Sequence, residues 1–134
     1  MEAATTPTIH LDEIGQIALT VDDLDQARAF YRDTLGMKFL FDAGSMIFFQ
    51  CGSIRLLIGT GEQHAKPSPS TILYFRVADL VATHAGLRAA NVEFTEEPHL
   101  VARMKSHDLW LAFLKDPAGN TLGLMSEVTR AEGN

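Results

Sequence analysis

The sequence predicts an α+β fold built from two tandem β-α-β-β-β modules, and a duplication in the chain is the main reason. A strand-like segment that runs into a helix-like segment occurs at residues 14–36 and again at residues 71–90. The apolar face of the strand recurs in both copies, so that Ile17 of the first corresponds to Leu73 of the second. A repeated strand and helix of this kind marks a duplicated supersecondary unit. Each copy is also followed by segments that alternate as strands do, which completes the module.

Module 1 is expected to span about residues 13–60. Asp22 or Asp23 can cap the helix that follows the first strand, and Gly36 is placed to end it. Three strands follow, separated by the turns at Gly44 and Gly52. Their expected bounds are 37–41, 45–51 and 53–59.

Module 2 is expected to span about residues 71–128, after a proline-containing linker at 61–70. Its helix should run over 79–90 and end at Asn91, which tolerates the left-handed conformation. The expected strands are 92–95, 108–115 and 121–128. Residues 97–107 have no counterpart of equal length in module 1, and an insertion on a repeated scaffold is a place where function is often located.

Composition predicts a single soluble domain over residues 1–134 and excludes two classes of partner. The chain is 46% hydrophobic and 21% charged, with a formal net charge of −6. It lacks the basic runs of a nucleic-acid binder, an apolar stretch of bilayer length and the features of a signal peptide. Its only cysteine, Cys51, fits a reducing compartment. We therefore expect a cytoplasmic protein without a nucleic-acid or membrane partner.

Two motifs in this order resemble the vicinal oxygen chelate superfamily. They are Phe30-Tyr-Arg-Asp-Thr-Leu-Gly36 at the end of the first helix and Asp116-Pro-Ala-Gly-Asn-Thr-Leu before the last strand. The superfamily includes glyoxalase I, methylmalonyl-CoA epimerase, extradiol dioxygenases, fosfomycin-resistance enzymes and bleomycin-binding proteins. The resemblance implies a curved mixed sheet that forms an open cup, with the helices outside. It also implies a homodimer, in which a cup can be completed by the partner chain.

The resemblance further implies where a metal would be bound, because metal-dependent members place ligands at four equivalent strand positions. In this chain those positions are Gln16, Arg55, Ile72 and Gly123. A divalent ion needs three or four N, O or S donors, whereas this set offers one neutral amide, one cation and two residues without a donor. We therefore predict no metal at these positions and no cofactor. The alternative is one divalent metal ion held elsewhere.

The predicted ligand site combines the strand face opposite to Ile17 with the insertion. Arginine suits an anionic or planar ligand, and aromatic side chains suit stacking. The interpretation is metal-independent binding of a small molecule that is anionic or aromatic. The candidate ligand-binding residues are Gln16, Arg55, Tyr74, Arg76, His99, Arg103, His107, Trp110 and Met125.

The insertion leaves three roles open for its two histidines. His99, Arg103 and His107 are spaced by four residues, which predicts one common side for a helix and for a regular strand. The histidines are candidates for a relocated metal site with Asp108, for acid or base catalysis, or for anchoring the segment by hydrogen bonds. The catalytic role corresponds to the alternative function: a lyase, isomerase or epimerase of the glyoxalase I or methylmalonyl-CoA epimerase type.

Overall fold

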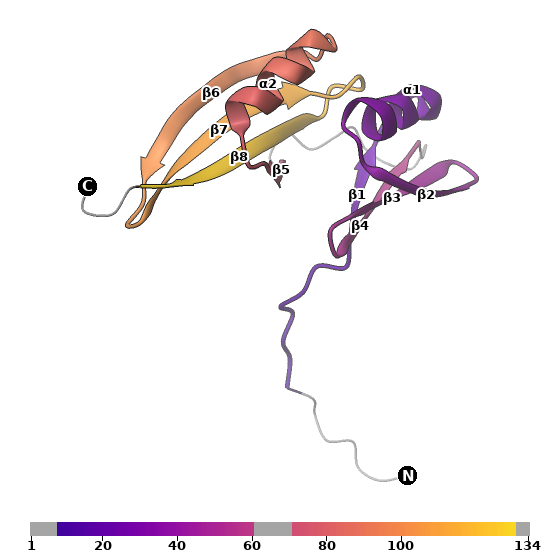
Figure 1. The fold of residues 1–134 in the computed structure, drawn as a ribbon. Helices are drawn as coiled ribbons and strands as arrows, with labels where there is room; N and C mark the ends of the chain where they lie inside the picture. The colour runs from indigo at the N-terminus through magenta and orange to yellow at the C-terminus, as the bar shows by residue number, and fades with distance from the viewer. Residues whose placement is uncertain (1–7, 61–70, 131–134) are drawn as a thin grey trace.

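The computed structural model describes residues 8–60 and 71–130, and in this part of the chain two four-stranded sheets each carry one helical segment (Figure 1). In module 1 the strand order is β1-β4-β3-β2, with β1 parallel to β4 and the other neighbours antiparallel. The bounds are β1 Gln16–Thr20, β2 Lys38–Ala43, β3 Met46–Cys51 and β4 Ile54–Gly59. The expected linker, residues 61–70, lies outside the described residues.

Module 2 repeats this topology with the strand order β5-β8-β7-β6, in which β5 is parallel to β8. The bounds are β5 Leu73–Arg76, β6 Phe94–Arg103, β7 His107–Lys115 and β8 Thr121–Thr129. The predicted α+β fold of two tandem β-α-β-β-β modules with open mixed sheets is confirmed.

The helix of module 1 contains a feature that apolar spacing does not predict. It begins as α1 (Leu24–Arg28), where the Asp23 carboxylate accepts a hydrogen bond from the Gln26 backbone N–H at 3.0 Å. It continues as a π-helical segment, η1 (Ala29–Thr34), which carries the buried Phe30 and Tyr31. A π-turn holds one more residue than an α-turn, so side chains in this segment point in other directions than a continuous α-helix would give them.

The helix of module 2, α2, spans Leu80–Ala89 and is capped in the same way by Asp79, whose carboxylate accepts from the Ala82 N–H at 3.0 Å. Asn91 follows the helix with a φ of 67°, which confirms the expected left-handed terminator. No helix among residues 8–60 and 71–130 is long and apolar enough to cross a membrane.

Each sheet has a face beneath its helix and an opposite face that we call the open face. The helix-side residues of both modules, such as Phe49 and Leu124, join in one hydrophobic core cluster. The open faces follow from strand alternation and the register. The open face of module 1 includes Gln16, Phe41, Phe48, Arg55 and Leu57, and that of module 2 includes Tyr74, Arg76, His99, His107, Gly123, Met125 and Glu127.

A buried polar network joins the modules and connects the two sequence motifs. The Tyr31 hydroxyl donates to Oδ2 of Asp116 at 2.7 Å, and the Asn120 amide donates to the same oxygen at 2.8 Å. The Asn120 amide also donates to the Thr20 carbonyl of β1 at 3.1 Å. Burial, followed by the neighbouring Asp116 carboxyl, raises the pKa of Tyr31 well above its ordinary value. The motifs therefore hold the two modules against each other.

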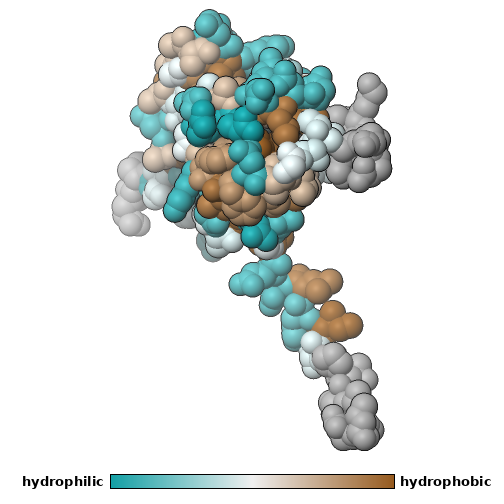
Figure 2. Space-filling view, turned by 90° about the vertical axis from the view of Figure 1, so that its right-hand side faces the viewer, coloured by the Kyte–Doolittle hydropathy of each residue, from teal (hydrophilic) through white to brown (hydrophobic). Residues whose placement is uncertain are grey.

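Residues 8–15, which precede β1, have no regular structure and extend away from the body of the molecule (Figure 2). Their apolar side chains Ile9, Leu11 and Ile14 are exposed. On the body, this view shows hydrophobic side chains gathered near the middle and surrounded by hydrophilic ones.

Candidate functional site

The four positions at which the resemblance implies metal ligands all lie on strands or at their start. Gln16 and Arg55 are register partners on the parallel strands β1 and β4, and Arg55 Nε donates to Gln16 Oε1 at 2.8 Å. Ile72 precedes β5, and Gly123 lies on β8 opposite Tyr74. The amide oxygen of Gln16 is therefore already engaged by a cation.

Gly123 is covered by the ring of Tyr74. A Cβ atom built on Gly123 would lie 2.6 Å from Cδ2 of Tyr74, which is closer than real Cβ contacts allow. The Tyr74 ring also meets Phe113 edge to face, with ring centroids 5.7 Å apart. The ring takes the space that a longer side chain at position 123 would need, so Gly123 is matched to Tyr74.

These side chains do not fit a divalent ion. Arg55 is a permanent cation, Gln16 is its hydrogen-bond acceptor, and neither Ile72 nor Gly123 has a donor atom in its side chain. In the part of the chain that the structure describes, no group of three or more His, Cys, Asp or Glu side chains is placed to hold a metal ion. His99, His107 and Asp108 therefore do not form such a group.

The open face of module 1 carries an aromatic cluster next to Arg55. Phe41 and Phe48 stack with ring centroids 4.7 Å apart and an interplanar angle of 30°. The Arg55 guanidinium carbon lies 5.7 Å from the centroid of the Phe48 ring. Neither phenylalanine is among the site residues predicted from the sequence, because Phe48 and Phe49 are adjacent and a bulge in β2 shifts the pairing between Phe39 and Phe41. The register of β2 against β3 is the information that identifies them.

The open face of module 2 carries a cluster of charged side chains around Glu127. Arg76 Nη2 lies 3.4 Å from Oε1 of Glu127, and His107 Nε2 lies 3.3 Å from Oε2. The second contact is not aligned as a hydrogen bond. Glu127 was not among the predicted site residues, although the two-residue alternation of β8 places it on the same face as Met125.

His99 belongs to the same open face but has its own partners. Its Nε2 atom lies 3.5 Å from Oε1 of Glu96, and its Nδ1 atom lies 2.7 Å from the Glu97 carbonyl oxygen. His99 pairs with Leu111 across the hairpin, and Leu111 pairs with Met125. The structure therefore brings His99, His107, Tyr74, Arg76 and Met125 onto one face, in agreement with the alternation argument.

Arg103 and Trp110 lie on the other face of the same hairpin, contrary to expectation. The insertion extends strand β6, and register shifts interrupt its pairing with β7, one of them between Leu100 and Ala102. A bulge adds one residue to a strand and reverses the alternation beyond it. Arg103 consequently pairs with Asp108, with Nη1 at 3.7 Å from Oδ2, on the helix side. The predicted common side therefore holds for the two histidines and not for Arg103.

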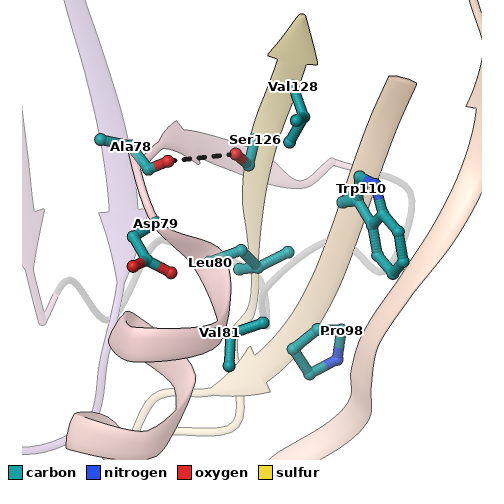
Figure 3. A pocket seen from close by; sticks show the side chains of 8 residues that line it. All are labelled: Ala78, Asp79, Leu80, Val81, Pro98, Trp110, Ser126 and Val128. Atoms are coloured by element: carbon teal, nitrogen blue, oxygen red, sulfur yellow. Dashed lines mark hydrogen bonds between the residues drawn. The ribbon is translucent and has the colours of Figure 1, made fainter. Parts of the chain in front are cut away.

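Trp110 lines a cavity of about 250 Å³ beside the N-terminus of α2 (Figure 3). It packs against the hydrophobic core together with residues of the helix side, and Pro98 and Leu80 face it across the cavity. Ser126 Oγ donates to the Ala78 carbonyl at 3.5 Å at the edge of this space. Trp110 is therefore separated from the open face by the sheet itself.

A second cavity, of about 200 Å³, lies where the modules meet and is almost wholly apolar. Ile72 and Tyr74 contribute to it from module 2 and Cys51 from module 1. In this cavity the predicted site residue Tyr74 adjoins module 1 of the same chain.

The open-face clusters of the two modules are not joined to each other. Among residues 8–60 and 71–130, the side-chain hydrogen bonds that cross between modules are those of Tyr31 and Asn120. Two of the predicted residues, Gln16 and Arg55, therefore lie on the open face of module 1, and five lie on that of module 2: Tyr74, Arg76, His99, His107 and Met125.

Solved structures share this fold. A lactoylglutathione lyase from Agrobacterium tumefaciens matches with 23% identity and a TM-score of 0.69, over 86% of this chain and 93% of that one. An antibiotic binding protein from Streptomyces sp. CB03234 matches with 21% identity and a TM-score of 0.72, over 90% and 99%. A superfamily member from Sphaerobacter thermophilus gives 20% identity and a TM-score of 0.72, over 87% and 98%.

No curated protein matches the chain significantly. The family model described as Glyoxalase/Bleomycin resistance protein/Dioxygenase superfamily matches residues 13–124, which include both motifs and nearly all of the two modules. Because this match covers most of the chain and agrees with the duplicated fold and the motif network, the chain belongs to the Glyoxalase/Bleomycin resistance protein/Dioxygenase superfamily.

Proposed function

We propose that this protein is a metal-independent small-molecule binding protein of its superfamily, acting in the cytoplasm. One observation carries the proposal: the Arg55 guanidinium donates to Gln16 at 2.8 Å. These residues stand at two of the strand positions where the resemblance to metal-dependent superfamily members implies metal ligands. The Tyr74 ring over Gly123 supports the same interpretation in module 2. A site filled by a cation and an aromatic ring is suited to recognition through hydrogen bonds and stacking.

The balance of polar and apolar groups on the open faces supports small-molecule binding. Phe41 and Tyr74 are 47% and 46% exposed, although large aromatic side chains usually gain stability from burial. Arg55 and Glu127 provide directional polar contacts beside them. Binding pockets typically combine an apolar lining with a few placed polar groups. The fold shared with an antibiotic binding protein is compatible with this use.

We also propose that the complete cup forms between two copies of the chain. The modules of one chain meet through the network of Tyr31, Asp116 and Asn120, and their open-face clusters remain apart. A two-fold dimer can place the open face of module 1 against the open face of module 2 of the partner. Such a dimer would contain two equivalent cups, each with residues from both chains.

Calorimetric titration tests the functional proposal directly. Aromatic and anionic compounds are screened by thermal shift on protein treated with EDTA, and each hit is titrated with and without the chelator. We expect saturable binding with one ligand per cup and a dissociation constant that EDTA leaves unchanged. Binding that requires added zinc, nickel, iron or manganese would contradict the proposal.

The contact between His107 and Glu127 favours one alternative, a metal-free lyase, isomerase or epimerase. An imidazole 3.3 Å from a carboxylate on a cup face has the composition of a general base and its orienting group. Incubation of the EDTA-treated protein with 2-oxo and thioester substrates tests this alternative. Turnover that disappears in His107→Ala would support an enzyme, and ligand binding without turnover supports the binding protein.

A further inference from the structure

We infer that the open face of module 1 recognises an aromatic acid, with the aromatic ring of the ligand against Phe41 and its acid group at Arg55. This inference rests on the proposed small-molecule site and names the class of ligand. It uses the stacked pair Phe41 and Phe48, the hydrogen bond from Arg55 to Gln16, and the ion pairing of the other arginines.

The charge of Arg55 is not balanced within the described part of the chain. Arg55 donates to the neutral amide of Gln16, and no carboxylate of residues 8–60 or 71–130 lies within ion-pair distance of it. The other arginines in these residues all contact carboxylates: Arg28, Arg32, Arg76, Arg88, Arg103 and Arg130. Within the described residues, Arg55 is therefore the arginine whose positive charge has no carboxylate partner and can meet a ligand.

The guanidinium of Arg55 is held in place before a ligand arrives. Its Nε atom is used by Gln16, and its guanidinium carbon lies 5.7 Å from the Phe48 ring centroid. The two terminal amino groups of a guanidinium can each donate to one oxygen of a carboxylate, which gives a paired and directional contact. A side chain that is already ordered loses less entropy on binding. Gln16 is thus a positioning residue for Arg55.

The aromatic half of the site lies next to this cation. Phe48 is 9% exposed, and its ring is near both Phe41, which stacks on it, and the Arg55 guanidinium. Phe41 covers it in a stacked arrangement and leaves almost half of its own surface open to solvent. A planar ligand that stacks on Phe41 therefore extends toward Arg55 along the same face. Two-ring aromatic acids have a suitable extent and charge.

The open face of module 2 does not offer an equivalent anion site. Its arginine, Arg76, lies 3.4 Å from Glu127, and this carboxylate also contacts His107. An acid group placed there would meet the negative charge of Glu127 as well as the arginine. The acid end of the ligand is therefore assigned to module 1.

The test compares 2-naphthoate with its neutral analogue 2-naphthamide in calorimetric titrations of the wild-type protein, Arg55→Gln and Arg88→Gln. Arg88→Gln removes the same charge from α2, outside both open faces. We expect wild type to bind the acid at least about tenfold more tightly than the amide. The preference should be lost in Arg55→Gln, retained in Arg88→Gln and reduced by salt.

Equal affinities of wild type for the two compounds would overturn the inference, and so would an undiminished preference for the acid in Arg55→Gln. The comparison of acid and amide on wild type remains decisive if Arg55→Gln does not fold. Phe41→Leu should weaken both compounds, and an unchanged affinity would remove the aromatic part of the assignment. Tight binding of the amide alone would contradict the assignment of an aromatic acid and would leave the proposed small-molecule function intact. If neither compound binds but other compounds in the thermal-shift screen do, the aromatic acid is likewise contradicted and the small-molecule function stands.

Discussion

At the scale of single residues, the hydrogen bond from Tyr31 to Asp116 has the clearest energetic consequence. Both side chains are buried, and the 2.7 Å bond crosses from module 1 to module 2. Tyr31→Phe removes the donor and leaves Asp116 with the remaining bonds from Asn120 and Ala118. Hydrogen bonds to charged groups contribute about 1.5–3 kcal/mol, so we expect the free energy of unfolding to fall by this amount.

The matched control for this change is the other tyrosine of the chain. Tyr74 is 46% exposed, so Tyr74→Phe should change the free energy of unfolding by less than about 0.5 kcal/mol. Urea unfolding of the two variants and the wild type checks the prediction. Equal losses in the two variants would show that the bond to Asp116 contributes little.

The raised pKa of Tyr31 also predicts how stability depends on pH. Its burial disfavours the charged phenolate, so the folded protein holds the proton more strongly than the unfolded chain does. The corresponding stability is present below the unfolded value of about 10 and is lost as the pH rises above it. Tyr31→Phe should therefore lose less stability than wild type between about pH 9 and 11, as measured by urea unfolding. A parallel decline in both proteins would contradict this assignment.

The residue scale also shows how far the site was predictable. The resemblance placed Gln16 and Arg55 at two of the four equivalent strand positions, and in the structure they are register partners. The hydrogen bond between them depends on that parallel register, which one strand alone does not define. Glu127 was missed because it follows the apolar part of β8, and its relation to Arg76 and His107 arises only when three strands are aligned.

At the scale of elements, the β6–β7 hairpin decides which insertion residues reach the open face. The sequence predicted the duplicated strands and helices, because their periodicity is local and their caps and turns are strong. It did not predict that residues 97–103 extend β6, nor where the bulges lie. A bulge is set by pairing with the neighbouring strand, so the face of Arg103 was assigned wrongly while that of His107 agreed.

This placement predicts different effects for two alanine substitutions in the hairpin. His107→Ala should weaken the best ligand from the calorimetric screen at least about tenfold, because His107 lies on the open face beside Glu127. Arg103→Ala should leave the affinity nearly unchanged, because its partner Asp108 lies on the helix side. The free energy of unfolding of Arg103→Ala should differ from that of wild type by less than about 0.5 kcal/mol, since the Arg103 side chain is 68% exposed.

Thermal melting and titration of both variants separate binding from stability. If His107 anchors the hairpin, His107→Ala will instead lower the free energy of unfolding by about 1–3 kcal/mol. The affinity of the folded fraction would then be unchanged. That result, or an equal loss of affinity in Arg103→Ala, would count against the placement of the site on the open face.

At the scale of the whole molecule, one shared hydrophobic core joins the two modules. The helix sides of the two modules join in one hydrophobic cluster, and the motif network links the modules by hydrogen bonds. The sequence predicted the two modules, but the contacts between them are formed by residues far apart in the chain and have no local signal. The resemblance supplied the expectation of a cup shared between copies, and the separated open faces support it.

A homodimer is the prediction that belongs to this scale. Light scattering at micromolar concentration should give about twice the chain mass of 14.7 kDa, because each open face gains an apolar and polar counterpart on dimer formation. Phe41→Glu should shift the equilibrium toward the monomer, whereas Arg88→Glu on α2 should not. A single species of chain mass in the wild type at every concentration would contradict the shared cup.

The metal content of the protein purified without chelator tests the central claim most directly. Arg55, Ile72 and Gly123 supply no ligand at three of the four strand positions, and Gln16 is engaged by Arg55. Elemental analysis should therefore find each divalent transition metal far below one equivalent per chain in protein that binds its ligand. One equivalent of zinc, nickel, iron or manganese would contradict metal-independent binding and would return His99 and His107 to consideration as ligands.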